Sequence, residues 1–389
     1  MLFLILLLSD AYCVGGIIMK YPIRVLQVVT YMGRVGLETM LMNYYRHIDR
    51  SKVQFDFLTH REFDGDYDKE IIDLGGNVYH LSNLNPLSTS YKKSLNEFIE
   101  SHPEYKIVHS HLDCMAGIPL KYAKLNNVPI RIAHAHNSNQ TKDLKYPLKL
   151  FYKRNIKKNA NYLFACGDEA GKWMFNTDNF KVLNNAINAK DYTLNTNIRN
   201  NKRKEFSISD DSILVGHVGR FFPQKNHEFL IDIFNQFHKY HPNSYLMLVG
   251  EGELKTSIQD KARTLGLEDN IIFTGLRSDV NELLQAMDVF LFPSLYEGLP
   301  VSIIEAQAAG LPCLISDKVP IECKKTDLVY QLNLNDSVNV WSDKIYELSH
   351  ITRRDTYEQI KESGFDIIEN AKWLENFYIG LYKKAIGEE

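Results

Sequence analysis

Residues 289–315 read VFLFPSLYEGLPVSIIEAQAAGLPCLI, which describes a strand, a turn, a helix and a second strand. The apolar runs at 289–293 and 312–315 have the length of buried strands, and 301–309 has the length of a short helix. Pro300 is placed to start this helix, because proline is favoured at the first helical position. This order of elements is typical of an α/β sheet with parallel strands.

The same alternation extends in both directions from this stretch. In the second half, further strands are predicted at 213–218, 245–249 and 271–274, with helices at 227–240 and 254–265. In the first half, strands are predicted at 23–30, 54–58, 77–81, 107–110, 130–134, 162–165 and 181–183. The pattern predicts two Rossmann-like domains, each a doubly wound parallel sheet. Ligands of such sheets bind at the carboxyl ends of strands, so two sheets facing a central cleft would take one substrate from each side.

The chain of 389 residues is long enough for two such cores. Met19-Lys20 stands directly before the first strand, so the apolar segment ahead of it is expected to be an over-extended N-terminus. A polar stretch rich in Asn, Lys and Thr is expected to be a linker, and an amphipathic helix at the end is expected to return to the first domain. The N-terminal extension is placed at 1–18 and the first domain at 19–187. The linker follows at 188–204, the second domain at 205–365 and the C-terminal helix at 366–389.

Charge and cysteine content exclude several classes of protein. The 45 basic and 48 acidic residues nearly balance, which argues against a general nucleic-acid binder. The five cysteines include no CxxC pair and form an odd set, so neither a zinc ribbon nor a disulfide framework is indicated. We expect a protein of the reducing cytoplasm that binds no nucleic acid.

Two cations and a glycine follow the predicted strand 213–218. Gly219 lets backbone approach a ligand closely, Arg220 can hold phosphate oxygens with two hydrogen bonds, and Lys225 adds a point charge. The alternative, a pair of solvated surface cations, is less favoured because both follow a strand end. The pattern indicates a diphosphate site.

Glycines recur at the ends of the neighbouring strands. Gly250-Glu251-Gly252 follows one strand, and Gly275-Leu276-Arg277 follows the next. Each is weak alone, since glycines at strand ends are usually turns. Their repetition at one edge of one sheet marks the place where a nucleotide would lie.

Two carboxylates flank the helix predicted at 301–309. The turn Gly298-Leu299-Pro300 leads into its N-terminus, where free N–H groups and the helix dipole favour an anion. Glu297 precedes the helix and can accept hydrogen bonds from sugar hydroxyls, and Glu305 lies inside it and can reach ribose hydroxyls. The alternative makes Glu297 a helix cap and Glu305 a surface residue, but Glu305 stands between apolar neighbours.

These residues resemble the donor domain of the family 4 retaining glycosyltransferases, which have the GT-B fold. The resemblance rests on Gly219-Arg220, Gln224-Lys225-Asn226, Gly250-Glu251-Gly252, Phe273-Thr274-Gly275 and the two glutamates of 297–305. It implies that Glu297 contacts the transferred sugar and Glu305 the ribose. It also implies that Arg220 and Lys225 bind the diphosphate of a nucleotide-sugar donor, usually a UDP-sugar, and that backbone near Leu276 contacts the base.

By the same resemblance, the acceptor is a hydroxyl of a saccharide, which a lipid carries in capsule, exopolysaccharide or lipopolysaccharide assembly. The first loop, with Gly33 and Gly36, opens a helix and could hold a phosphate. It departs from the GxGxxG pattern of dinucleotide-binding proteins, and Val35 replaces the first of two adjacent glycines that the family usually has. His111 matches the histidine that approaches the reacting sugar, and His136 and Asn137 are expected on the acceptor or phosphate side.

Two patterns in the first half suggest a metal but are interpreted otherwise. His109-Ser-His111 and His134-Ala-His136 each place two imidazoles on one face of a strand, but a catalytic zinc usually needs a further ligand, for which Asp113 is a candidate. Hydrogen-bonding histidines, or histidines merely buried near strand ends, are favoured. Asp64-Gly65-Asp66 has the spacing of the DxD motif of the other large glycosyltransferase fold but lies away from the diphosphate site. We expect no metal requirement and no cofactor.

The segment 142–158 is both basic and amphipathic. It carries seven cations interleaved with Leu148, Phe151, Tyr152 and Ile156. Such a helix can lie on an anionic membrane surface, where it would suit a lipid-linked acceptor, or it can be an ordinary solvated face.

Two other functions remain open. A UDP-sugar epimerase of similar fold would need no acceptor. A non-catalytic partner subunit would bind sugar nucleotide without transferring the sugar. The complete set of cations and carboxylates argues against a subunit that has lost its catalytic residues.

Overall fold

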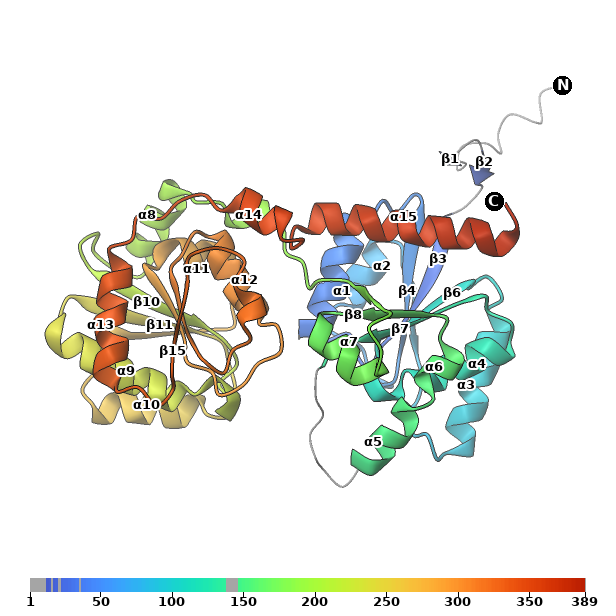
Figure 1. The fold of residues 1–389 in the computed structure, drawn as a ribbon, viewed down its shortest axis with the longest axis horizontal. Helices are drawn as coiled ribbons and strands as arrows, with labels where there is room; N and C mark the ends of the chain where they lie inside the picture. Colours follow the sequence, from blue (N-terminus) through green and yellow to red (C-terminus); the bar gives the residue numbers. More distant parts are fainter. Residues whose placement is uncertain (1–11, 15–16, 20–21, 35, 138–145, 389) are drawn as a thin grey trace. The chain divides into compact units, whose positions relative to one another are not determined.

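The computed structural model describes residues 12–14, 17–19, 22–34, 36–137 and 146–388. The chain divides into two compact units (Figure 1). The first unit contains Met1–Ala186 together with Ile367–Glu389, and the second contains Ile187–Asp366. Most of the predicted N-terminal extension, residues 1–11 and 15–16, lies outside the described residues.

The first unit is built on a sheet of seven parallel strands in the order β5-β4-β3-β6-β7-β8-β9. The strands are β3 (Ile23–Val28), β4 (Val53–Thr59), β5 (Val78–His80), β6 (Ile107–Ser110), β7 (Ile130–Ala135), β8 (Tyr162–Ala165) and β9 (Lys181–Val182). Its α-helices are α1 (Gly36–His47), α2 (Asp68–Asp73), α3 (Thr89–Ser101), α4 (Gly117–Leu125), α5 (Tyr146–Lys153), α6 (Ile156–Asn159), α7 (Asp168–Phe175) and α15 (Ile367–Ile386). A separate antiparallel pair joins β1 (Tyr12–Val14) and β2 (Ile17–Met19).

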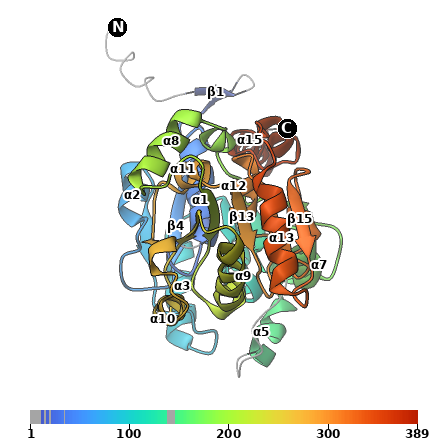
Figure 2. The same cartoon turned by 90° about the vertical axis from the view of Figure 1, so that its left-hand side faces the viewer.

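The second unit has six parallel strands in the order β12-β11-β10-β13-β14-β15. They are β10 (Ile213–Val218), β11 (Ser244–Val249), β12 (Ile271–Gly275), β13 (Val289–Phe292), β14 (Cys313–Ser316) and β15 (Val329–Leu332). The α-helices are α8 (Thr196–Glu205), α9 (His227–Tyr240), α10 (Lys255–Thr264), α11 (Val280–Ala286), α12 (Val301–Ala308), α13 (Val338–Ser349) and α14 (Tyr357–Glu362). The 3₁₀ turns η2 (Ala189–Tyr192) and η3 (Pro223–Lys225) carry residues of the site. Helices α9 and α13 pack side by side (Figure 2).

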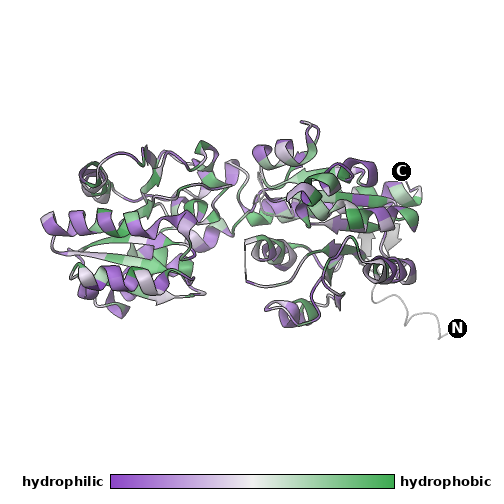
Figure 3. Cartoon of the chain, turned by 90° about the horizontal axis from the view of Figure 1, so that it is seen from below, coloured by the Kyte–Doolittle hydropathy of each residue, from purple (hydrophilic) through white to green (hydrophobic). Residues whose placement is uncertain are grey.

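The strand β13 shows why these sequences form sheets covered on both faces. All four of its residues are buried. Val289 and Leu291 pack into one apolar cluster, whereas Phe290 and Phe292 pack into the other. Because side chains alternate along a strand, a continuous apolar run fills the cores on both sides. In Figure 3 the strands of each unit are accordingly the hydrophobic interior, and outward faces of the helices are hydrophilic. The predicted fold class of two doubly wound parallel sheets is confirmed.

The segment 188–204, expected as a linker, instead forms η2 and most of α8 within the second unit. Arg203 is 1% exposed, and its guanidinium donates to the carbonyl oxygens of Ala286, Ser209 and Ser212. A polar helix is thus held by charge-assisted hydrogen bonds to carbonyl groups, which composition does not reveal.

The C-terminal helix α15 belongs to the first unit. Ala371, Leu374 and Tyr378 are buried in the cluster that contains Val25 and Phe55 of β3 and β4. None of the described helices is long and apolar enough to span a bilayer.

Candidate functional site

The loops after β10 and β13 meet where the strand order of the second unit reverses. Strand β10 pairs with β11 on one side and with β13 on the other. Gln224 and Asn226 bind the second loop: Leu295 N donates to Gln224 O at 2.8 Å, and Asn226 Nδ2 donates to Pro293 O at 3.1 Å. Ligands of open α/β sheets bind at this kind of switch point.

An ion pair joins the same two loops. Lys225 Nζ lies 2.7 Å from Glu297 Oε1, and Gln224 Nε2 donates to Glu297 Oε2 at 3.1 Å. Lys225 Nζ also lies 4.6 Å from the centre of the Phe292 ring. The Lys225 and Glu297 side chains are only 17% and 6% exposed, so both charged groups are held in place before any ligand binds.

Arg220 lies beside this pair in sequence but has different surroundings. It is exposed, and its guanidinium lies 5.3 Å from the centre of the Phe222 ring. Within the described residues, no carboxylate lies within ion-pair distance of it. Its positive charge is therefore available to an anion.

The predicted glycines have two kinds of surroundings. Gly250 has φ +141°, and a Cβ there would lie 2.2 Å from Gly219 O. Gly252 has φ +157°, and its Cβ would lie 2.4 Å from Phe221 O. These two glycines let the loop after β11 pack against the loop after β10, so they shape the site through backbone contact. By contrast, a Cβ at Gly298 would meet nothing within 4 Å.

Glu305 of α12 accepts a hydrogen bond from the Tyr192 hydroxyl, with Oη 2.8 Å from Oε1. Burial raises the pKa of Glu305 above its ordinary value, and the Tyr192 hydrogen bond opposes this. Sequence reasoning missed Tyr192 because its segment was interpreted as a linker.

The turn before α12 differs in one detail from the prediction. Pro300 is the extended N-cap, and Val301 is the first helical residue. Leu299 is half-buried, and Leu276 at the end of β12 is 78% exposed.

In the first unit, His111 is 3% exposed and both its ring nitrogens are engaged. Nδ1 lies 2.9 Å from His136 Nε2, and Nε2 lies 2.9 Å from Gln27 Oε1. Because an amide oxygen only accepts, Nε2 of the neutral ring donates to Gln27, and Nδ1 accepts from His136. Burial lowers the pKa of His111 well below its usual value, so the ring is neutral. Gln27 was not predicted from the sequence.

Asp113 and Asn137 lie next to this pair. Asp113 accepts from the backbone N–H of His136 at 3.0 Å and from Asn137 Nδ2 at 2.5 Å. Burial raises the pKa of Asp113. The structure thus brings His111, His136 and Asn137 together at the ends of β6 and β7, and Asp113 holds the loop that carries the last two.

The first loop is organised by the DxD-like segment. Gly36 is the first residue of α1, and Val35 lies outside the described residues. Asp66 Oδ2 accepts from the backbone N–H of Arg34 at 3.1 Å, and a Cβ on Gly33 would lie 3.5 Å from the same oxygen. Asp66 therefore serves as a hydrogen-bond acceptor for the loop of Gly33.

The basic segment predicted at 142–158 forms α5 and α6, and 142–145 lies outside the described residues. Phe151 is 59% exposed, and Lys153 Nζ lies 4.0 Å from the centre of a ring of Trp173.

Comparison with known proteins identifies the family. Residues 198–325 match the family described as "Glycosyl transferases group 1". The chain is 36% identical to the putative glycosyltransferase EpsF of Bacillus subtilis over 91% of this chain and 96% of that protein. It is 25% identical to the UDP-Gal:alpha-D-GlcNAc-diphosphoundecaprenol alpha-1,3-galactosyltransferase of Escherichia coli over 78% and 81% of the two chains.

Solved structures show the same fold. Anabaena HepE in complex with UDP and glucose has a TM-score of 0.67 at 15% identity, with 93% of this chain and 98% of HepE covered. A glycosyltransferase from Rickettsia africae has a TM-score of 0.72 at 15% identity, with 95% and 100% covered. From these matches and the site described above, the chain belongs to the group 1 glycosyltransferases and is a glycosyltransferase of the GT-B fold.

Proposed function

We propose that this glycosyltransferase, as a family 4 enzyme, moves a sugar with retention of configuration from a UDP-sugar to a hydroxyl of a lipid-linked saccharide in polysaccharide biosynthesis. The observation that carries the proposal is the half-buried ion pair of Lys225 and Glu297 at the switch point, with the exposed cation of Arg220 on the same loop as Lys225. The Escherichia coli relative is named for a UDP-galactose donor and an undecaprenol-linked acceptor, and HepE was solved with UDP and glucose. Both support a nucleotide-sugar donor.

In the donor complex, Arg220 and Lys225 bind the diphosphate. Lys225 then turns from Glu297 toward the phosphate oxygens, which frees the Glu297 carboxylate for hydroxyls of the transferred sugar. Glu305 binds the ribose. Gly298, Leu299 and Pro300 lead into the N-terminus of α12, whose free N–H groups favour the phosphate, and the base lies against backbone near Leu276. Gly219, Gly250 and Gly252 keep the loops close enough to form this pocket.

Catalysis is then mainly electrostatic. As the bond between the anomeric carbon and the phosphate oxygen breaks, negative charge grows on the departing diphosphate, and Arg220 and Lys225 stabilise it more than they stabilise the ground state. The acceptor hydroxyl attacks from the same face, and the leaving phosphate takes its proton. These two cations and the helix dipole supply the charge, so transfer requires neither a divalent ion nor a cofactor.

His111, with His136 and Asn137, is proposed to lie on the acceptor side, with the loop of Gly33 and Gly36. Since His111 is neutral and both its ring nitrogens are engaged within the protein, it contributes a rigid polar wall to this side rather than a charge or a free hydrogen bond. Phe151 and the cations of α5 and α6 are proposed to contact the cytoplasmic face of the membrane, where the lipid-linked acceptor lies. Sedimentation with vesicles of anionic lipid, compared with neutral vesicles, tests that contact.

The decisive experiment uses the purified chain alone. Labelled UDP-glucose, UDP-galactose, UDP-N-acetylglucosamine and GDP-mannose are each incubated with and without an undecaprenyl-diphosphate-linked saccharide, without added Mg²⁺ or Mn²⁺. Acceptor-dependent labelling of the lipid, with NMR showing the donor's anomeric configuration in the product, supports the proposal. Conversion of the donor sugar without acceptor would identify an epimerase. Donor binding without any turnover would identify a non-catalytic subunit.

A further inference from the structure

Four histidine side chains stack against one another in the first unit. His109 and His111 come from β6 and the residues after it, and His134 and His136 come from β7 and its end. Neighbouring ring centroids are 4.1–5.2 Å apart. Residues two apart in a strand share a face, and Ser110 lies opposite Ala133, so the register of β6 and β7 places both pairs on one face. Three of these side chains, His109, His111 and His134, are at most 3% exposed.

The hydrogen bonds of this cluster are incomplete. His109 Nδ1 lies 2.7 Å from the Tyr378 hydroxyl, and His111 Nε2 lies 2.9 Å from Gln27 Oε1. Within the described residues, His109 Nε2, both ring nitrogens of His134 and Nδ1 of His136 are buried without a partner. A buried polar atom without a partner destabilises the folded protein. Four such atoms in one cluster mark it as a candidate site for a ligand.

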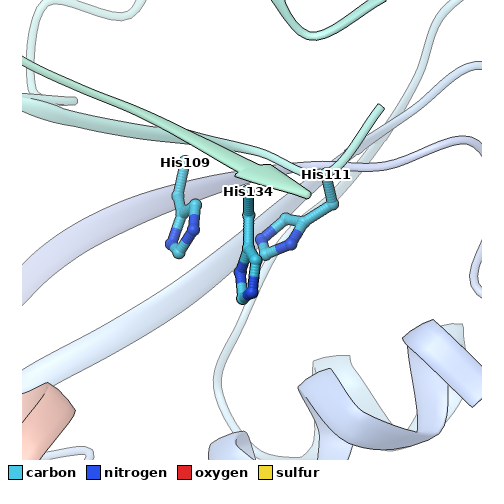
Figure 4. A group of neighbouring side chains, drawn as sticks. All are labelled: His109, His111 and His134. Carbon is cyan, nitrogen blue, oxygen red and sulfur yellow. The ribbon is translucent and has the colours of Figure 1, made fainter. Parts of the chain in front are cut away.

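We propose that His109, His111 and His134 bind one first-row transition-metal ion, zinc in the first instance. One nitrogen from each ring lies within 4.8 Å of the others, and the three rings lie next to one another in Figure 4. Zinc binds imidazole nitrogen at about 2.0–2.1 Å, so tetrahedral ligand atoms are about 3.4 Å apart. Small side-chain rotations close the remaining gap. A water molecule completes the tetrahedron.

The groups behind these histidines suit metal binding. A ligating histidine almost always donates its other ring N–H to an oxygen acceptor, which fixes the ring. Gln27 Oε1 can accept from His111 Nε2, and the Tyr378 hydroxyl can accept from His109 Nδ1. His111 Nδ1 and His109 Nε2 are then the nitrogens that bind the metal. When metal binds, His111 Nδ1 loses its contact with His136 Nε2.

The chemistry of the ligand set points to zinc or a similar ion. Metal ions bind the neutral form of imidazole, in which one ring nitrogen keeps a free lone pair. Imidazole ligands suit Zn²⁺, Cu²⁺ and Ni²⁺, whereas Mg²⁺ and Ca²⁺ prefer oxygen. A single His-x-His pair offers only two ligands. Because β6 and β7 are neighbours, His134 of β7 adds the third ligand to His109 and His111.

The experiment uses the untagged full chain, stripped of metal by a chelator and titrated with Co²⁺. The expected result is the visible absorption of one tetrahedral Co²⁺ per chain, which an equivalent of Zn²⁺ abolishes. His109→Gln and His134→Gln should each lose this absorption. His60→Gln is the matched control, because His60 is also buried in the first unit but lies outside the cluster, bound to Val29 O at 2.8 Å.

Absorption that is absent from the wild type, or unchanged in a folded His109→Gln or His134→Gln variant, overturns the proposal. Circular dichroism shows whether each variant is folded. If both variants unfold, imidazole ¹⁵N NMR of the wild type decides: Zn²⁺ must shift the signals of the cluster and leave that of His60 in place. These readouts are independent of sugar transfer, so failure of the metal site and failure of the proposed function are distinguishable.

Discussion

Arg220 and Lys225 follow the same strand, yet their charges are arranged differently. Lys225 is paired with Glu297, whereas Arg220 has no carboxylate within ion-pair distance in the described parts of the chain. A bound diphosphate must compete with Glu297 for Lys225 but meets no such competitor at Arg220. Arg220 should therefore interact most directly with charge that develops on the leaving group.

Replacing Arg220 tests this role. Arg220→Ala should lower kcat about 100- to 1000-fold, the loss typical of removing one donor to developing negative charge, and should leave the acceptor KM nearly unchanged. Lys239→Ala, which removes an exposed cation from α9, is the control. Steady-state kinetics with the best donor provide the measurement, and unchanged turnover in Arg220→Ala would reject the role.

Tyr192 donates a hydrogen bond to Glu305 that opposes the effect of burial on the pKa of this carboxyl group. Tyr192→Phe removes the hydrogen bond that opposes the raised pKa of Glu305, so that pKa should rise further. Since the ionised carboxylate binds ribose hydroxyls better, the donor KM of the variant should be about five times that of the wild type. On acidification, the donor KM of the variant should also begin to rise at a higher pH than that of the wild type. Donor KM measured across pH checks this, with Tyr240→Phe as a control at an exposed tyrosine. A pH profile that does not move would show that Glu305 does not titrate in donor binding.

Glu38 of α1 should make the first unit less stable at alkaline pH. Burial raises its pKa from 4.5 to about 7, and its Oε2 has no partner within the described residues. Between these two values the folded chain holds a proton that the unfolded chain has lost, so the free energy of unfolding falls as the pH rises through this window. Glu38→Gln should therefore stabilise the protein by about 2–3 kcal/mol at pH 8 and by little below pH 5. Urea unfolding at the two pH values measures this, and an equal effect at both would contradict it.

Sequence motifs predicted which charged residues of the second unit lie together better than they predicted the partners of Glu305 and His111. Arg220, Lys225 and Glu297 stand in short motifs next to strand ends, so their neighbourhood could be predicted from local order. Tyr192 and Gln27 contact Glu305 and His111, which are far away in the chain. Such contacts depend on the packing of whole elements, which no local pattern contains.

At the scale of elements, the apolar runs predicted every strand of the first sheet and all but one strand of the second. The exception is β15, an edge strand of four residues in which only Val329 is buried. An edge strand needs less apolar surface than a central one, so its signal is weaker. Helix α8 was missed for a related reason, since guanidinium hydrogen bonds rather than an apolar stripe attach it to the unit.

Gly250, directly after β11, should tolerate no side chain. Gly250→Ala would place a Cβ against the carbonyl oxygen of Gly219 in a strained backbone conformation, so the second unit should lose at least about 3 kcal/mol of stability. Gly298→Ala is the matched control for stability, because its Cβ meets open space. Thermal unfolding compares the two, and equal melting temperatures would contradict the packing argument.

At the scale of the whole molecule, the chain has three tryptophans divided between the units. Trp341 is buried in the second unit, whereas Trp173 and Trp373 belong to the first. In a Trp173→Phe, Trp373→Phe variant, fluorescence reports the second unit alone. A UDP-sugar at 100 times its Kd should stabilise the transition seen by Trp341 by about 2.7 kcal/mol. Urea unfolding of this variant with and without donor measures the change, and no change would show that the donor does not bind the second unit.

The return of α15 to the first unit affects how the protein is made. Strands β3 and β4 leave the ribosome early, but the helix that covers Val25 and Phe55 follows the whole second unit in the chain. Domains generally fold in the order of translation. Here the second unit has all its strands and helices before α15 can complete the core of the first unit. We therefore expect the nascent chain to carry an uncovered apolar face until α15 has been synthesised, and chaperones that bind such surfaces near the exit tunnel should associate with it.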